Sequence, residues 1–135
     1  TVREVETFHD DRGGALRGTN TVRVFTAGGL SAVHLGDLGH QLTVEQAAAI
    51  GPVDAVLVPV GGVYTVDAAG AKAVCDALHP RCVVPMHYHH APYGLTEVDS
   101  VEPFLELWPA EEVHHLQGAA FELTEQTTGV MVPSF

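Results

Sequence analysis

Residues 53–90 read VDAVLVPVGGVYTVDAAGAKAVCDALHPRCVVPMHYHH, and this stretch indicates the fold most clearly. Its two ends, 53–62 and 81–90, each hold a short apolar run bounded by turn residues, which is typical of a strand buried on both faces. Between them, residues 65–80 are mostly good helix formers that stop at a proline. The stretch therefore predicts a β-α-β unit with parallel strands and a right-handed crossover.

The two predicted strands end alike, in a Val-Pro step followed by a polar or glycine-rich turn. The carboxyl ends of parallel strands lie at the same edge of a sheet, and α/β proteins generally bind their ligands at this edge. His87 follows the second strand directly. Topology therefore places His87 at a functional edge before any motif is considered.

The rest of the chain extends this α/β pattern on both sides. Thr43 is in place to cap a helix over 42–51, and Thr65 or Asp67 to cap the helix of the β-α-β unit. His79, before a proline, suits the C-terminal end of that helix. The other expected elements are a strand at 3–8, a loop at 9–19, a hairpin at 20–36, a helix near 99–107, and strands around 112–116, 119–124 and 129–133. No linker divides the chain, so residues 1–135 are expected to form a single domain.

Composition excludes several classes of partner. The chain has 135 residues, 46% of them apolar, which is enough to bury a core. Six basic and seventeen acidic side chains leave a net charge of −11, which nucleic acid and anionic membranes would repel. No apolar run approaches the roughly 18–20 residues that cross a bilayer. Cys75 and Cys82 lack CxxC spacing and the N-terminus lacks a signal-peptide pattern, so we expect reduced cysteines and a cytoplasmic location.

A second stretch, VHLGDLGH at 33–40, sets Asp37 in a turn that contains two glycines. His9 and His87 likewise follow predicted strands. Neutral imidazoles and carboxylates are ligands of zinc and of Mn²⁺ or Fe²⁺, and ligands from scattered loops suit an open site better than a zinc finger. Each residue also has an ordinary alternative: a solvated loop histidine for His9, and an Asx-type turn for Asp37.

Four motifs follow one another along the chain: FHDDRGGALRGTN, HLGDLGH, PVGGVYTVDAAGA and PMHY. In this order they resemble the motifs of the metallo-β-lactamase-fold hydrolases, and they look most like the branch that includes L-ascorbate-6-phosphate lactonase. The resemblance implies an αββα sandwich with one or two divalent metal ions, zinc or else manganese or iron, along one edge. It implies His9 as a ligand of the first metal, Asp37 as the bridging ligand and His87 as a ligand of the second. Gly36 and Gly39 would let the backbone turn so that Asp37 points at the metals.

Other residues near these motifs are candidates for the pocket. His40 is expected to contact substrate or transfer a proton, and with Asp37 makes up the predicted catalytic pair. His34 lies within a strand and is expected to pack there or to orient a ligand. Four residues that either contact substrate or serve only packing and loop stability are Arg17, Asn20, Tyr64 and Tyr88. The paired histidines at 89–90 and 114–115 are not expected to bind metal.

The chain departs from the family in one respect, because it has no HxHxDH motif. In the family this motif belongs to the N-terminal half, so the chain resembles the C-terminal β-α half of the sandwich alone. It would then be part of a longer protein, the product of a split gene, or a subunit that pairs with a second copy. In each case a sheet face needs another cover, because a large exposed apolar patch is unusual in a soluble monomer. The expected partners are a small-molecule substrate and either a second copy or a complementing N-terminal half.

Two functions follow as hypotheses. The first is a metal-dependent hydrolase in which a metal-activated water attacks a lactone, ester or phosphoester. The second is a catalytically silent metal-binding or oligomerisation module that has lost half of its ligands. Alanine at Asp37 separates the two, because only the enzyme has turnover to lose. A nucleic-acid processing enzyme of the same fold is disfavoured by the charge of −11 and the lack of a basic stripe.

Overall fold

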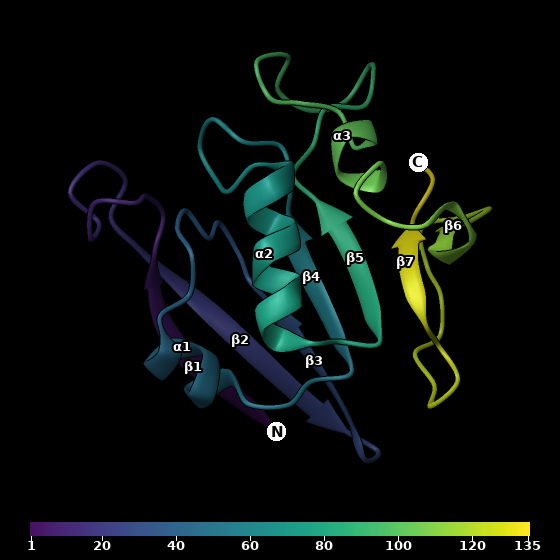
Figure 1. Ribbon diagram of the computed structural model, residues 1–135, viewed down its shortest axis with the longest axis horizontal. Coiled ribbons are helices and arrows are strands. Elements are labelled where there is room, and N and C mark those ends of the chain that lie inside the picture. Colours follow the sequence, from purple (N-terminus) through teal and green to yellow (C-terminus); the bar gives the residue numbers. More distant parts are fainter.

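A computed structural model describes residues 1–135. The chain forms one mixed sheet with helices packed against it (Figure 1). The sheet has seven strands in the order β1-β2-β3-β4-β5-β7-β6. The elements in chain order are β1 (Val2–Phe8), β2 (Thr19–Ala27), β3 (Leu30–His34), α1 (Val44–Ile50), β4 (Ala55–Pro59), α2 (Ala68–Leu78), β5 (Cys82–Met86), α3 (Glu102–Leu105), a 3₁₀ turn (Ala110–Glu112), β6 (Val113–His115) and β7 (Gly129–Val132). This is the mixed α/β architecture that the sequence predicts.

The β-α-β unit at the centre of the sheet is confirmed. β4 and β5 pair in parallel, with Val56 opposite Val83, and α2 lies between them in sequence. Asp67 caps α2 by accepting a hydrogen bond from the N–H of Gly70 at 2.8 Å, which satisfies one of the free donors of the first turn. His79 ends the helix in the left-handed conformation, with φ +52°.

The N-terminal part of the chain builds the antiparallel half of the sheet and matches the expected strands and helix. β1 pairs with β2, and β2 pairs with β3 through the tight turn after Ala27. β3 then pairs with β4 in parallel, so the hairpin and the β-α-β unit form one continuous sheet. Thr43 caps α1 in a capping box with Gln46. None of the helices has the length and apolar character needed to cross a membrane.

The two faces of the sheet are covered unequally. On one face lie α1 and α2 (Figure 1), over core valines that are at most 2% exposed: Val22, Val24, Val33, Val56, Val58, Val83 and Val130. The residues that alternate with these valines are buried at Ala55, Pro59 and Cys82, but they are half-buried or exposed at Phe25, Ala32, Leu57, Val84 and Met131. Complete burial of β4 and β5 on both faces is therefore not observed, because this chain places no helix and no second sheet over the other face.

The C-terminal tail differs from expectation in one segment. Residues 112–116 and 129–133 contain β6 and β7, and the helix near 99–107 is present as the shorter α3. Residues 119–124 were expected to form a strand, and they form none. The turn at their end is held by a side chain instead of a neighbouring strand, because the Arg81 guanidinium donates to the carbonyls of Thr124, Glu125 and Thr127.

Candidate active site

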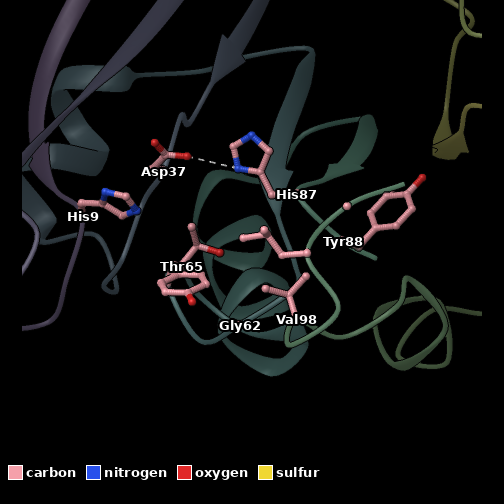
Figure 2. Close-up of a pocket in the computed structure, with 10 residues that line it drawn as sticks. His9, Asp37, Gly62, Thr65, His87, Tyr88 and Val98 are labelled. Atoms are coloured by element: carbon pink, nitrogen blue, oxygen red, sulfur yellow. Dashed lines mark ion pairs between the residues drawn. The ribbon is translucent and has the colours of Figure 1, made fainter. Parts of the chain in front are cut away.

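A pocket opens at the carboxyl edge of the sheet, where topology places His87. Its volume is about 370 Å³, which is in the range of small-molecule sites. It lies between the ends of β1 and β3 and the loops that follow β4 and β5 (Figure 2). The lining residues are His9, Asp37, Gly62, Tyr64, Thr65, His87, Tyr88, Gly94, Leu95 and Val98. The three residues expected to bind metal are thus walls of one pocket.

Asp37 and His87 face each other in this pocket (Figure 2). Oδ1 of Asp37 lies 3.3 Å from Nδ1 of His87, and the two side chains are 51% and 43% exposed. The contact is an ion pair when His87 is protonated. His87 has φ +55°, a conformation that residues other than glycine rarely adopt, and backbone strain of this kind clusters at functional sites. The sheet edge therefore holds two potential metal donors together and open to solvent.

His9 comes from a different strand end, directly after β1, and its ring points into the pocket (Figure 2). The N–H of His9 donates to the carbonyl of Gly18 at 3.0 Å, and the carbonyl of Phe8 accepts the N–H of Gly39 at 2.9 Å. A Cβ on Gly39 would collide with the backbone of His9, so close approach, and not a positive φ, explains this glycine. These contacts tie the end of β1 to the loop that carries Asp37.

Asp10, which is not among the candidates expected from the sequence, organises the loop that follows His9. Its carboxylate is 2% exposed and accepts four backbone hydrogen bonds of 2.7–2.8 Å, from the N–H groups of Arg12, Gly14, Leu16 and Arg17. Burial alone would raise the pKa of Asp10, but the four donors together hold that pKa far below its usual range. Two aspartates followed by two glycines are a turn signal that points to this arrangement.

Asn20 holds the turn that presents Asp37. Its Oδ1 accepts the N–H of Asp37 at 2.9 Å. Its Nδ2 donates to the carbonyl of Leu35 at 2.9 Å and to Oγ1 of Thr7 at 2.8 Å. Gly36 has φ +61°, and a Cβ there would press on Oδ1 of Asn20, so the turn requires glycine at this position. Asn20 therefore belongs to the support of the site, not to the lining of the pocket.

His34 lies behind Asp37, at the end of β3. Its Nδ1 accepts the N–H of Gly36 at 3.0 Å. Burial of the ring, together with the charges of His87 and Arg23, lowers the pKa of His34, and the charge of Asp37 opposes that shift only in part. His34 in its neutral form holds the backbone beside Asp37, and its role in orienting a ligand stays a prediction.

His40 does not line the pocket, contrary to the role expected for it. Its Nε2 accepts the N–H of Phe8 at 3.0 Å, and its Nδ1 lies 2.7 Å from the carbonyl of Gln41. The neutral tautomer with its proton on Nδ1 satisfies both bonds. Both ring nitrogens thus join β1 to the loop after β3, outside the lining of the pocket.

The two candidate tyrosines differ in orientation. The hydroxyl of Tyr64 donates to Oε1 of Glu97 at 2.7 Å, and the guanidinium carbon of Arg17 lies 5.4 Å from the centre of the Tyr64 ring. The hydrogen bond to Glu97 raises the pKa of Tyr64, and the charge of Glu97 adds to the shift. The ring of Tyr88 points away from the other labelled residues and packs against Phe135, with ring centres 6.3 Å apart (Figure 2).

The donors fit a divalent metal in kind but not in number. Two imidazoles and a carboxylate are a suitable set for zinc, manganese or iron. No group of three or more His, Cys, Asp or Glu side chains in the chain lies close enough together to hold an ion. Asp37 and His87 therefore form a pair, with His9 at the wall of the same pocket, and a complete site needs further ligands. The paired histidines at 89–90 and 114–115 lie outside the pocket lining.

Comparison with known proteins places this geometry in a family. Residues 1–87 match the family model described as "Beta-lactamase superfamily domain". The chain is 36% identical over 75 residues to a UPF0173 metal-dependent hydrolase of Carboxydothermus hydrogenoformans, which covers 56% of this chain and 33% of that protein. It is 38% identical over 61 residues to a UPF0173 metal-dependent hydrolase of Thermoplasma acidophilum, which covers 45% of this chain and 27% of that protein. The aligned part thus spans about a third or less of these relatives.

Solved structures give the same result for the fold. A protein of Thermotoga maritima, named as a candidate Zn-dependent hydrolase of the metallo-beta-lactamase superfamily, has a TM-score of 0.83 and 38% identity, over 98% of this chain and 63% of that chain. A metal-dependent hydrolase candidate of Parabacteroides distasonis has a TM-score of 0.62 over 98% of this chain and 50% of that chain. At 13% identity, this second likeness shows the fold alone. From the family match over residues 1–87 and the shared fold, the chain belongs to the metallo-beta-lactamase superfamily.

Proposed function

We propose that this chain is the C-terminal part of a metal-dependent hydrolase that acts on a lactone, an ester or a phosphoester. The observation that carries the proposal is the contact between Asp37 and His87, in a pocket whose wall also includes His9. All three follow the ends of strands, so the fold itself brings them to one edge. The names of the relatives, which are metal-dependent hydrolases, support the same class.

Asp37, His87 and His9 are the residues that would hold a divalent ion, with zinc as the proposed metal. A bound ion of this kind lowers the pKa of water toward ~7 and stabilises the oxyanion that forms on a carbonyl or phosphoryl group. The chain's own contribution is position. Asn20 and His34 hold the backbone beside Asp37 through hydrogen bonds of 2.9 and 3.0 Å, so that the carboxylate faces His87.

We further propose that the missing ligands come from another polypeptide segment, either a complementing N-terminal half or a second copy of the chain. Two features support this. The pocket lacks a group of three donors, and the sheet face that carries Leu57 and Val84 is only half-buried. Residues 1–135 are taken as a single domain within that assembly. The two cysteines are free and buried, which supports a reducing, cytoplasmic location.

Native mass spectrometry of the chain, prepared without chelator and then loaded with zinc, tests the proposal. We expect a dimer or a two-chain complex that retains metal and hydrolyses simple esters. The Asp37→Ala variant should lose both metal and turnover while keeping its melting temperature. The matched control is Asp76→Ala, which removes an exposed carboxylate on α2 that pairs only with Lys72. Its metal content and turnover should stay as in the parent chain.

Two results would contradict the proposal. A metal-free monomer without turnover would leave Asp37, His87 and His9 without a catalytic role in this chain. Metal retained without hydrolysis of any lactone, ester or phosphoester would favour the silent metal-binding module instead. The observation that favours the silent module is that no three potential metal donors lie close together in the chain.

A further inference from the structure

We propose that the pocket contains a subsite for a neutral, apolar part of the substrate, an aliphatic chain or an aromatic ring attached to the group that is hydrolysed. The subsite consists of Tyr64, Leu95 and Val98. The inference rests on the proposed hydrolase function, and it adds the chemical class of the substrate to it. It follows from how the lining residues divide, from the charges at the rim, and from the way two loops are held together.

The lining of the pocket divides into a polar and an apolar part. His9, Asp37 and His87 supply the polar part, while the large side chains elsewhere in the lining are aromatic or aliphatic. Val98 lies away from Asp37 and on the other side of the pocket (Figure 2). A site built in this way binds by excluding water from apolar surface at one end and by orienting a polar group at the other.

Two large apolar or aromatic side chains that line the pocket face solvent. Leu95 is 56% exposed and Tyr64 36%, and Val63, which precedes Tyr64 in the chain but does not line the pocket, is 58% exposed. Single exposed apolar residues are ordinary, but a group of them around a pocket marks a binding surface. Val63 also has φ +65°, which is an outlier for a β-branched residue. Strain of this kind is kept where the surroundings impose it, and here it lies in the loop that carries Tyr64.

The charges at the rim do not favour an anionic group. No lysine or arginine lines the pocket. The Arg17 guanidinium lies over the face of Tyr64, 5.4 Å from the ring centre, and the Glu97 carboxylate accepts the Tyr64 hydroxyl at 2.7 Å. The hydroxyl of Tyr64 is thereby occupied and Arg17 covers one face of its ring, which leaves the other face as the available surface. Recognition of a phosphate or carboxylate needs free cationic or N–H donors, and the side chains of this subsite offer none.

The subsite is built by two loops that are tied together. The N–H of Asp99 donates to the carbonyl of Gly61 at 2.8 Å, and the N–H of His89 donates to the carbonyl of Asp99 at 2.9 Å. With the bond between Tyr64 and Glu97, these contacts fix the loop after β5 against the loop after β4. The pocket volume of about 370 Å³ exceeds the ~150 Å³ of a cavity that binds benzene. There is room for a ring-sized group beside a reacting carbonyl.

Titration of the ¹⁵N-labelled chain with three amides tests the subsite without turnover. Hexanamide, acetamide and succinamate share the amide head and differ in the tail: apolar, absent and anionic. We expect hexanamide to bind about tenfold or more tightly than acetamide, with amide shifts at 62–65 and 94–98, and succinamate to bind no more tightly than acetamide. Leu95→Ser should weaken hexanamide about fivefold. The control Leu107→Ser changes a leucine that is 44% exposed and outside the pocket, and it should have no effect.

The subsite is overturned if succinamate binds more tightly than hexanamide, if the shifts map elsewhere, or if Leu95→Ser leaves hexanamide binding unchanged. A second assay, hydrolysis of ethyl acetate and ethyl hexanoate by the zinc-loaded chain, separates this inference from the proposed function. Hexanamide binding without ester hydrolysis would uphold the subsite and count against the hydrolase. Hydrolysis with equal kcat/KM for the two esters, in the parent and in Leu95→Ser, would uphold the hydrolase and overturn the subsite.

Discussion

The two edges of the sheet use polar groups in opposite ways. At the amino edge of the parallel strands, Asp54 accepts the N–H of Ser31 and a guanidinium N–H of Arg81, each at 2.8 Å. Arg81 also donates to three backbone carbonyls of the tail. At the carboxyl edge, Asp37 and His87 have 3.3 Å between them and remain about half exposed. Asp54 and Arg81 are satisfied internally at one edge, whereas at the other edge the pair of Asp37 and His87 stays open to a ligand.

The backbone shows this contrast only in part. Of the three residues other than glycine with positive φ, His87 and Val63 lie at the carboxyl edge, with φ +55° and +65°, and His79, with φ +52°, lies between α2 and β5 near the amino edge. Asp54 and Arg81 have ordinary backbone conformations, and they join β3, β4, β5 and the tail at their starting points. Functional regions are commonly the less stable parts of a protein, and a well-bonded region elsewhere offsets them. The open pair of polar side chains and the most extensively bonded ion pair thus lie at opposite edges of one sheet.

The largest effect is expected from breaking the amino edge. Arg81→Ala removes four hydrogen bonds and leaves Asp54 without its cation, so the free energy of unfolding should fall by about 3 kcal/mol. Urea denaturation measures this loss. Arg23→Ala is the matched control, because its pair with Glu4 is more than half exposed, and it should cost under ~0.5 kcal/mol. Similar losses in the two variants would remove the distinction between the edges.

A substitution at Asn20 tests whether the turn that presents Asp37 depends on the hydrogen bonds of the Asn20 side chain. Asn20→Ala removes the acceptor of the Asp37 N–H and the donor to the Leu35 carbonyl. We expect a loss of about 2 kcal/mol, because the partners are left partly buried and unpaired. Thermal unfolding measures it, with Thr19→Ala, an exposed neighbour on β2, as the control. A loss of stability no greater than that of the control would show that the turn does not need the Asn20 side chain.

Acid should weaken the amino edge through Asp54. Its pKa is lowered, first by the hydrogen bond from the Ser31 backbone and then by Arg81. Because the folded pKa lies below the unfolded value of about 3.9, the stabilisation is complete above about pH 4 and is lost as the pH falls through the folded pKa. Asp54→Asn should cost about 1–2 kcal/mol at pH 7, and the difference from the parent chain should shrink below about pH 4. A difference that does not change with pH would refute this assignment.

The smallest effect is expected from relieving strain at the carboxyl edge. Val63→Gly removes a β-branched side chain from φ +65° and should raise stability by about 0.5–1 kcal/mol, after the entropic cost of glycine. Val2→Gly is the matched control. Val2 is 57% exposed against 58% for Val63, and its φ is not positive, so this change should lower stability by about 0.5–1 kcal/mol. Chemical denaturation compares them, and a loss in both variants would mean that Val63 is not strained.

The parts of the fold that the sequence predicts correctly depend on local signals. The cap residues Thr43 and Asp67 act within one turn of their helices, and the apolar runs of β4 and β5 carry their own turn residues. The strand expected at 119–124 does not form, and the turn at the end of this segment depends on a non-local contact. Arg81, far away in the sequence, supplies the hydrogen bonds that the adjoining turn needs, and no local pattern shows this.

In the candidate site, too, some features can be predicted from the sequence and others depend on non-local contacts. Topology is sufficient to bring Asp37, His87 and His9 to one pocket, because each follows a strand that ends at the same edge. His40 accepts a hydrogen bond from Phe8, which is 32 positions away in the chain. The residues near His40 in the sequence do not predict this contact. Leu95 comes from a loop with neither periodicity nor a motif, so its place in the pocket appears only in the structure.

The arrangement around Asp10 has a consequence for engineering. One side chain holds the segment from Arg12 to Arg17 through four backbone N–H groups, and no side-chain hydrogen bond of that segment takes part in holding it. The backbone conformation of this loop beside the pocket therefore does not depend on hydrogen bonds from the loop's own side chains. Libraries that vary the side chains at Arg12 and Leu16 while keeping Asp10 would sample new surfaces on an unchanged frame, which makes this loop the natural place to recruit new specificities.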